Sequence, residues 1–293
     1  MSDVLVRPMQ PDDVVVAEGL SDEAFLHSDR AQFRRSWPDP EPRAATHSEN
    51  WVLRTQHFLA TDAGGCWVAE CAGDMIGFAT SIRRDGTWIL ATFAVRPGLQ
   101  GRGIGAQLLA AALTHSQGCL RGMLSSSSDV KAVRRYLLAG FTMHPQMFLR
   151  GTVDRSVIPV VQKVREGSAS DIDLLDSVDR HARGAGHGVD HAFMTASWHL
   201  QVSDTTTGSG YVYASAPGRV DLLAATNRRT AARLLWAALA DAPGEVTVPH
   251  LTAANAWAIE VGTAARLDLH QEGFLALRGM RPPSPYIHNG AML

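Results

Sequence analysis

The sequence lacks any long apolar run and any excess of basic charge. No stretch approaches the roughly 18 consecutive apolar residues that predict a membrane-spanning helix, and Met1–Pro8 lacks the apolar core of a secretion signal. Lysine and arginine total 27 against 29 acidic residues, which gives a formal net charge of −2. Because nucleic-acid-binding proteins usually carry a basic excess, the composition predicts a chain without a nucleic-acid or membrane partner.

Cysteine is scarce as well. The three cysteines, Cys66, Cys71 and Cys119, match no zinc-binding spacing and cannot all pair with one another. This favours a reducing, cytoplasmic setting. The rest of the composition, 45% hydrophobic and 19% charged, is that of an ordinary globular protein. A chain of 293 residues is long enough for two domains, each with its own core.

The first half predicts a mixed α/β domain. Helices are expected after Pro11, from Ile104 and from Asp129, which suits an N-cap. The last of these helices should bury Val130, Val133 and Leu137 and end at Gly140. A proline-rich loop is expected at Ser36–Pro42, where Trp37 either lines an acceptor pocket or packs on the surface. Alternation of apolar residues predicts strands at Val4–Arg7, Trp67–Glu70, Met75–Ile82, Thr87–Val95 and Gly122–Ser125.

The second half repeats the first. Val6-Arg7 and Asp12-Asp13 are echoed by Val164-Arg165 and Asp171, and residues 95–141 align without a gap with residues 221–267. This predicts two copies of one fold, at residues 1–157 and 158–293. The change in offset predicts that the second copy is shorter in the loops before its central strands.

A glycine-rich loop follows the strand Thr87–Val95. Its sequence, Gln100-Gly-Arg-Gly-Ile-Gly-Ala106, combines alternating glycines with a helix start, which suits the binding of a pyrophosphate. A P-loop is excluded, because no lysine follows the glycines. A dinucleotide fingerprint fits poorly, because Arg96–Gln100 separates the strand from the glycines. A glycine-rich turn without a ligand is the remaining alternative.

Residues 88–141 resemble the core of the GNAT (general control-related N-acetyltransferase) superfamily. The family loop Gln/Arg-x-x-Gly-x-Gly/Ala is matched by Gln100, Gly103 and Gly105. Asp129 stands where asparagine is usual, and Arg135 stands where an apolar residue is usual. Other positions that match the family pattern are Phe93-Ala94-Val95 before the loop and Ala132, Tyr136, Gly140 and Phe141 after it.

The resemblance implies an α/β (α+β) fold with two tandem GNAT-like domains, each a mixed, mostly antiparallel sheet flanked by helices. It also implies an acetyl-CoA-dependent N-acetyltransferase in which a primary amine, that of a small molecule, attacks the thioester directly. Tyr136 would be the catalytic residue, protonating the departing thiolate. The residues implied to bind acetyl-CoA are Phe93, Ala94, Val95, Gln100, Gly101, Arg102, Gly103, Ile104, Gly105, Ala106 and Asp129.

A general base is missing from the strands where the family often carries one. Ala91, Thr92 and Ala94 precede the loop, Met123 and Leu124 follow it, and none of them ionises. A water chain, a histidine, a carboxylate from elsewhere or the chain's own C-terminus could serve, and some substrates carry enough free amine to need no strong base. Two alternatives stay open: acetylation of a protein lysine or N-terminus, and a non-catalytic acyl-CoA sensor. A monomer and a homodimer are both compatible with the sequence.

The second copy has lost the motif. Thr226–Ala231 replaces Gln100–Ala106, and Gly262 replaces Tyr136, so this copy is predicted to serve architecture and substrate binding. The tail Arg281–Leu293 is expected to be anchored by Tyr286 and Ile287 and to reach the acceptor side, with the Leu293 carboxylate as one candidate base.

One histidine-rich segment could bind a metal. The spacing of His187 and His191 would suit a metal site on a helix, but Gly184, Gly186 and Gly188 argue against a helix there. A polar lining of a substrate cleft is a further alternative. A solvated loop that includes His181 and Asp190 is favoured over both, and no metal is predicted.

Overall fold

The computed structural model describes residues 4–33, 39–215 and 218–293. Contacts divide the chain into an N-terminal unit, Met1–Gly122 with Ser128–Gly140, and a C-terminal unit, Met123–Ser127 with Phe141–Leu293. Residues 141–157 therefore pack with the C-terminal unit, and the domain boundary after residue 157 stays a prediction. Trp37 and the start of the proline-rich segment lie outside the described residues.

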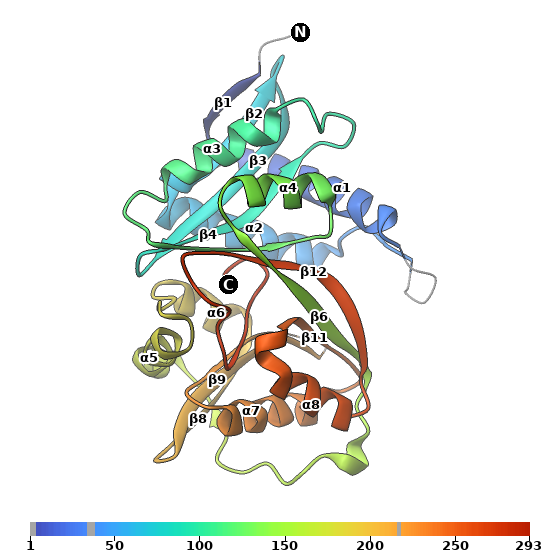
Figure 1. The fold of residues 1–293 in the computed structure, drawn as a ribbon, viewed down its shortest axis with the longest axis vertical. Helices are drawn as coiled ribbons and strands as arrows, with labels where there is room; N and C mark the ends of the chain where they lie inside the picture. The colour runs from blue at the N-terminus through green and yellow to red at the C-terminus, as the bar shows by residue number, and fades with distance from the viewer. Residues whose placement is uncertain (1–3, 34–38, 216–217) are drawn as a thin grey trace. The chain divides into compact units, whose positions relative to one another are not determined.

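The first repeat alternates strands and helices as its sequence pattern predicts (Figure 1). Strands β1 to β4 are antiparallel neighbours in chain order. The elements are β1 (Leu5–Pro8), α1 (Asp13–Ala31), α2 (Ala45–Thr61), β2 (Cys66–Cys71), β3 (Asp74–Arg84), β4 (Thr87–Val95), α3 (Ile104–Thr114), β5 (Arg121–Ser126), α4 (Val130–Leu138) and β6 (Thr142–Thr152).

The second repeat has the same order of strands and helices, which confirms the predicted repetition. Its elements are β7 (Arg165–Glu166), α5 (Ile172–Arg183), α6 (Asp190–Ser197), β8 (His199–Thr205), β9 (Gly208–Ser215), β10 (Arg219–Ala225), α7 (Arg228–Asp241), β11 (Glu245–Thr252), α8 (Ala256–Ala264) and β12 (Asp268–Arg278). A short strand, β13 (Tyr286–Ile287), follows in the tail.

Both repeats open with the same ion pair. Arg7 donates to both carboxylate oxygens of Asp13 at 2.7 and 2.9 Å, and the amide of Gln10 donates to the same carboxylate at 2.7 Å. Arg165 and Asp171 repeat this arrangement in the second copy, where Ser168 takes the place of Gln10. The echo seen in the sequence is therefore a shared corner that ties the first strand to the segment leading into the first helix.

The last strands of the two repeats are exchanged within the C-terminal unit. Its strand order is β5-β12-β6-β11-β10-β9-β8-β7, with β13 beside β10. Strand β6 pairs antiparallel with β12 on one side and with β11 on the other. Each repeat thus places its sixth strand beside the fifth strand of the other repeat.

The gapless alignment of the repeats holds only from the third helix onward. Helices α4 and α8, and strands β6 and β12, lie at the aligned positions. Strand β10, however, runs on to Ala225, and the Asn227 side chain already caps α7 by accepting from Thr230 N at 2.9 Å. The second copy has therefore lost the loop by deletion, and the predicted replacement of Gln100–Ala106 by Thr226–Ala231 is wrong because Arg228–Ala231 are helical.

The second copy is also shortened in its helices, whereas the sequence predicted that the shortening lies in the loops before its central strands. Helices α5 and α6 have 12 and 8 residues, whereas α1 and α2 have 19 and 17. In the C-terminal unit, α7 and α8 pack on each other and supply Leu234, Leu235 and Trp257 to the buried core (Figure 1). Among the described helices, none is both long and apolar enough to cross a membrane.

Candidate functional site

The glycine loop has the backbone that its sequence predicts. Gly101 and Gly103 have φ of +84° and +87°, and Gly103 is the N-cap of α3. A Cβ added at either position would meet no atom within 4 Å. Because this left-handed backbone favours glycine and the space beside it is open, a ligand can approach the main chain closely here.

Helix α3 directs its first amides toward this loop. The amides of Ala106 and Gln107 donate to the Gly103 carbonyl, while the amides before them have no carbonyl partner within the helix. These N–H groups and the helix dipole favour an anion. The side chain of Gln100 turns back and donates to the Val95 carbonyl at 3.3 Å, which fixes the loop to the end of β4.

Gly105 lets three elements of the N-terminal unit meet. An added Cβ at Gly105 would lie 3.1 Å from the Phe93 ring on β4 and 3.5 Å from the Arg135 guanidinium on α4. The Phe93 ring in turn meets the Tyr136 ring edge-on, with centroids 6.4 Å apart. The structure therefore brings the end of β4, the start of α3 and Tyr136 together, as predicted.

Tyr136 is the residue that α4 buries. Burial raises the pKa of its phenol, so the hydroxyl keeps its proton at neutral pH. The predicted apolar stripe of α4 is wrong, because Val130 and Leu137 are 79% and 51% exposed. Tyr136 lies on the face that the helix turns inward.

Asp129 caps α4, as predicted. Its Oδ1 accepts from the amides of Lys131 and Ala132 at 2.7 and 2.9 Å. This capping orients the helix that carries Tyr136. A direct contact between Asp129 and acetyl-CoA stays a prediction.

The other predicted contacts line the same region. Ala94, Ile104 and Gly105 are buried, Phe93 and Val95 are half-buried, and the exposed members are Gln100, Gly101, Arg102, Gly103 and Ala106. The sequence alone does not indicate a binding role for Arg135, because its position beside Gly105 depends on packing between α3 and α4. In the described part of the chain, the buried Nε of Arg96 has no hydrogen-bond partner. A diphosphate fits a loop that combines open glycines, helix amides and unpaired cationic groups.

Among the described residues of the second copy, there is no equivalent site. The place of Tyr136 is taken by Gly262, and a Cβ there would lie 2.2 Å from the Leu149 side chain. Strand β10 pairs instead with the tail, at Leu223 with Ile287 and Ala224 with Tyr286. The predicted anchoring of the tail is confirmed, because Tyr286 and Ile287 are buried. The main-chain oxygen of Leu293 accepts from the buried Arg183, and its role as a base stays a prediction.

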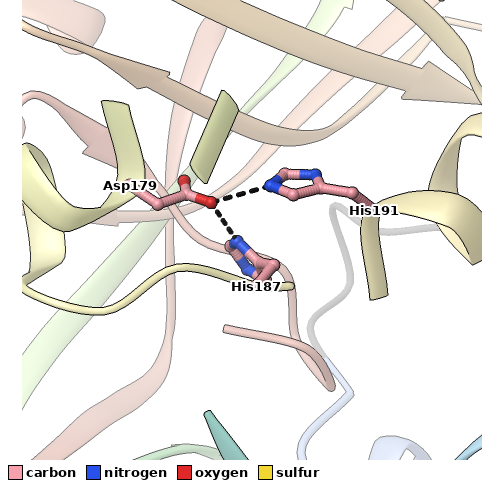
Figure 2. Close-up of side chains that lie close together, drawn as sticks. All are labelled: Asp179, His187 and His191. Carbon is pink, nitrogen blue, oxygen red and sulfur yellow. Dashed lines mark hydrogen bonds and ion pairs between the residues drawn. The ribbon is translucent and has the colours of Figure 1, made fainter. Parts of the chain in front are cut away.

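His187, Asp190 and His191 of the histidine segment are buried, so a solvated loop is wrong for them, whereas His181 is exposed as predicted. His187 and His191 are fully buried, and α6 begins at Asp190 despite the preceding glycines. Figure 2 shows both rings turned toward one carboxylate, that of Asp179 on α5, whose Oδ2 lies 2.7 Å from His187 Nδ1 and 2.9 Å from His191 Nε2. Asp179 could not be identified from the sequence, because its partners lie outside α5.

This cluster contains three metal-ligand atoms within 4.8 Å of one another. Its atoms are also joined by hydrogen bonds: the Tyr211 hydroxyl donates to Asp179 Oδ1 at 2.5 Å, and Tyr213 lies 3.2 Å from His191 Nδ1. Burial alone would raise the pKa of Asp179, but its histidine partners and Arg183 hold that pKa well below the usual range. The arrangement suits a polar network inside the core, and the expectation of no metal stays a prediction.

Comparisons with known proteins agree with this geometry. A model of the acetyltransferase (GNAT) family matches residues 23–141. Mycothiol acetyltransferase of Streptomyces avermitilis is 32% identical over 148 residues, which are 48% of this chain and 46% of that protein. The spore coat polysaccharide biosynthesis protein SpsD of Bacillus subtilis is 28% identical over 125 residues, 41% of this chain and 43% of that protein. The matches thus span less than half the length of these curated relatives.

A solved structure is similar over nearly the whole chain. This crystal structure from Pyrococcus horikoshii, described as a candidate acetyltransferase, has a TM-score of 0.73 at 18% identity and covers 99% of this chain and 95% of its own. Its likeness shows the fold of both repeats. The family model matches the first repeat, at residues 23–141, and the usual co-substrate of the GNAT family is acetyl-CoA.

Proposed function

We propose that the chain transfers an acetyl group from acetyl-CoA to the primary amine of a small molecule. The observation that carries the proposal is the loop Gln100–Ala106, where open left-handed glycines lead into the N-terminus of α3. The preference for a small molecule is supported by the curated relative that is named for mycothiol rather than for a protein.

Acetyl-CoA supplies the acetyl group as an activated thioester. In the proposed mechanism, the amides of Gly101–Ala106 bind the diphosphate, and Arg96 and Arg135 add positive charge. The main chain of Phe93–Val95 holds the pantetheine arm and polarises the thioester carbonyl. Tyr136 donates its proton to the departing thiolate. Burial keeps its phenol protonated at neutral pH and also makes it a weaker acid than a free tyrosine.

The proposal is tested by turnover of acetyl-CoA with a panel of acceptors. The panel contains glucosamine, 1,3-diaminopropane and cysteine methyl ester, together with peptides that offer a lysine or a free N-terminus. Acetylation of a small amine is expected, and Tyr136→Phe should lower kcat by about 10²–10⁴ with unchanged affinity for acetyl-CoA. Acetylation of peptides alone would favour the protein-modifying alternative. Binding of acetyl-CoA without acetylation of any acceptor would overturn the proposal and favour the sensor.

A further inference from the structure

Asp179, His187 and His191 form one buried cluster within the C-terminal unit, and each comes from a different segment. Asp179 lies on α5, His187 lies in the connection after α5, and His191 lies in the first turn of α6. All three side chains are fully buried, and Figure 2 shows both imidazole rings turned toward the carboxylate. Two imidazole nitrogens and one carboxylate oxygen are a donor set typical of divalent transition metals such as zinc.

The glycines around His187 do not keep the two histidines apart. Gly184 has φ of +80° and ends α5, and Gly188 has φ of +58° shortly before α6 begins. The chain turns between the two helices and brings His187 and His191 to the same oxygen of Asp179. The expectation of no metal rested on the lack of a single helix that carries both histidines, and the structure brings them together without such a helix.

The three donor atoms lie close enough for one ion to contact all of them. Asp179 Oδ2 is 2.7 Å from His187 Nδ1 and 2.9 Å from His191 Nε2, and the three atoms lie within 4.8 Å of one another. Zinc bonds of about 2.0–2.2 Å in a tetrahedral arrangement place neighbouring donor atoms about 3.3 Å apart. Shifts of about 1 Å or less therefore convert the hydrogen-bonded cluster into a metal site with the same donors.

The groups around the donors are those that hold metal ligands in place. An imidazole that ligates a metal through one nitrogen usually donates the N–H of the other to a neighbouring oxygen. The outer nitrogen of His191, Nδ1, lies 3.2 Å from the hydroxyl of Tyr213. The outer nitrogen of His187, Nε2, lies 3.5 Å from the hydroxyl of Tyr286. The Tyr211 hydroxyl donates to the second carboxylate oxygen, Oδ1, and leaves Oδ2 to the histidines.

The carboxylate of Asp179 is a buried charge without an arginine or lysine in contact. Among the described residues, it accepts hydrogen bonds from two histidines and from Tyr211. Arg183 on the same helix is directed elsewhere, since its guanidinium donates to the main-chain oxygens of Ala185 and Gly186. Because a buried carboxylate is costly unless a cation or a metal pairs with it, a divalent ion here would stabilise the folded state.

A second carboxylate reaches the edge of the cluster. Asp176 lies one turn before Asp179 on α5, and its Oδ1 is 3.5 Å from His191 Nε2. The amide of Gly188 donates to the same oxygen at 2.9 Å. The Asp176 side chain is 14% exposed, whereas the three central side chains are fully buried, so this is the side from which an ion enters. Two carboxylates, two neutral imidazoles and one divalent ion have charges that sum to zero, which suits a buried site.

We propose that Asp179, His187 and His191 bind one zinc ion, with Asp176 as the fourth ligand. The ion is structural and takes no part in acetyl transfer. It joins α5 and α6, which have 12 and 8 residues where α1 and α2 have 19 and 17. Shorter helices bury less apolar surface, and the metal bonds add the stability that this packing lacks.

The test begins with the parent protein, carrying no histidine tag and produced in medium supplemented with zinc. Elemental analysis after gel filtration should find about one zinc per chain. Removing the zinc with a chelator should lower Tm, and added zinc should restore it whereas added magnesium should not, because Mg²⁺ prefers oxygen donors. A parent protein that carries no zinc, and that binds none after treatment with the chelator, overturns the inference.

Two variants separate a metal site from a hydrogen-bonded network. His187→Asn and His191→Gln each keep an amide N–H near the position of the imidazole nitrogen that contacts Asp179, but an amide is a poor zinc ligand. Each should bind zinc at least about 100-fold more weakly by calorimetry. The control His181→Asn removes an exposed histidine of α5 and should bind zinc like the parent.

Zinc affinity that both ligand variants retain, or that only His181→Asn loses, overturns the inference, since the ion then lies elsewhere. The metal content of the parent and its recovery of Tm need no variant. They therefore decide the matter even if a substitution in the buried cluster prevents folding.

Discussion

Gly103 begins α3 with a left-handed backbone, and its missing side chain leaves the loop open. Gly103→Val should reduce affinity for acetyl-CoA at least tenfold, because a branched Cβ both strains the loop and fills the path to its amides. Gly73→Val is a matched control, since Gly73 has φ of +88° and equally open surroundings in the turn between β2 and β3. Calorimetry on both folded variants checks this. Equal affinities would show that the loop does not hold the ligand.

His288 should make the protein less stable in acid. Its folded-state pKa of about 3 lies below that of an unfolded histidine, so below pH 6.5 only the unfolded chain gains the proton. Stability present at neutral pH is therefore lost as the pH falls from about 6.5 toward 3. Between about pH 8 and pH 5 this one group should remove about 2 kcal/mol from the free energy of unfolding.

Urea unfolding at the two pH values measures this loss. His288→Asn should weaken the pH dependence by about that amount, whereas His27→Asn, at an exposed position of α1, should leave it unchanged. The groups that face His288 are His250 and Gln146, with Glu272 behind His250. A pH profile of His288→Asn that overlays that of the parent would contradict the assignment.

Residues are predictable from the sequence where spacing alone defines them. Gly103 and Tyr136 were found because the loop and the helix that carry them are continuous segments. Asp179 and Arg135 were not found, because their partners come from other elements and only packing brings them together. His187 was predicted to be exposed to solvent and is buried, because glycine-rich flanking residues do not show whether a segment will be buried.

At the scale of elements, helix α8 of the second copy carries Gly262 at the position that aligns with Tyr136, and no space for a side chain remains there. Leu149 of β6 fills the space that a side chain there would need. Gly262→Ala should therefore destabilise the protein by about 1–3 kcal/mol through overpacking, despite the better helix propensity of alanine. Gly244→Ala, where the surroundings are open, should not destabilise it. Urea midpoints decide between them, and equal midpoints would mean that Leu149 moves aside without cost.

The elements themselves were largely predictable from periodicity and caps. Strand β4 and the starts of α3 and α4 lie where apolar pattern and Asp129 place them. The alignment of the repeats is wrong before α7. Only the apolar stripes of the helices fixed the register, and they do not show that the loop after β10 is deleted. The start of the second repeat was found through Arg165 and Asp171, whose pairing needs a fixed spacing.

For the whole molecule, the repetition could be predicted but the exchange of β6 and β12 could not. Local pattern marks Thr142–Thr152 as a strand, yet it does not say which of two similar neighbours the strand will join. The two repeats offer equivalent fifth strands, β5 and β11, and only the structure shows that each sixth strand takes the partner from the other repeat.

This exchange suggests that the protein can be assembled from two separately made pieces. Val160 is 87% exposed in the connection between β6 and β7, so a chain break there cuts no buried backbone. Residues 1–160 and 161–293, produced together, should associate, because β6 of the first piece lies between β11 and β12 of the second. Co-purification through a tag on one piece measures the association. Replacing Leu149 and Met147 with lysine in the first piece should abolish it, and two pieces that stay apart would show that the exchange needs a continuous chain.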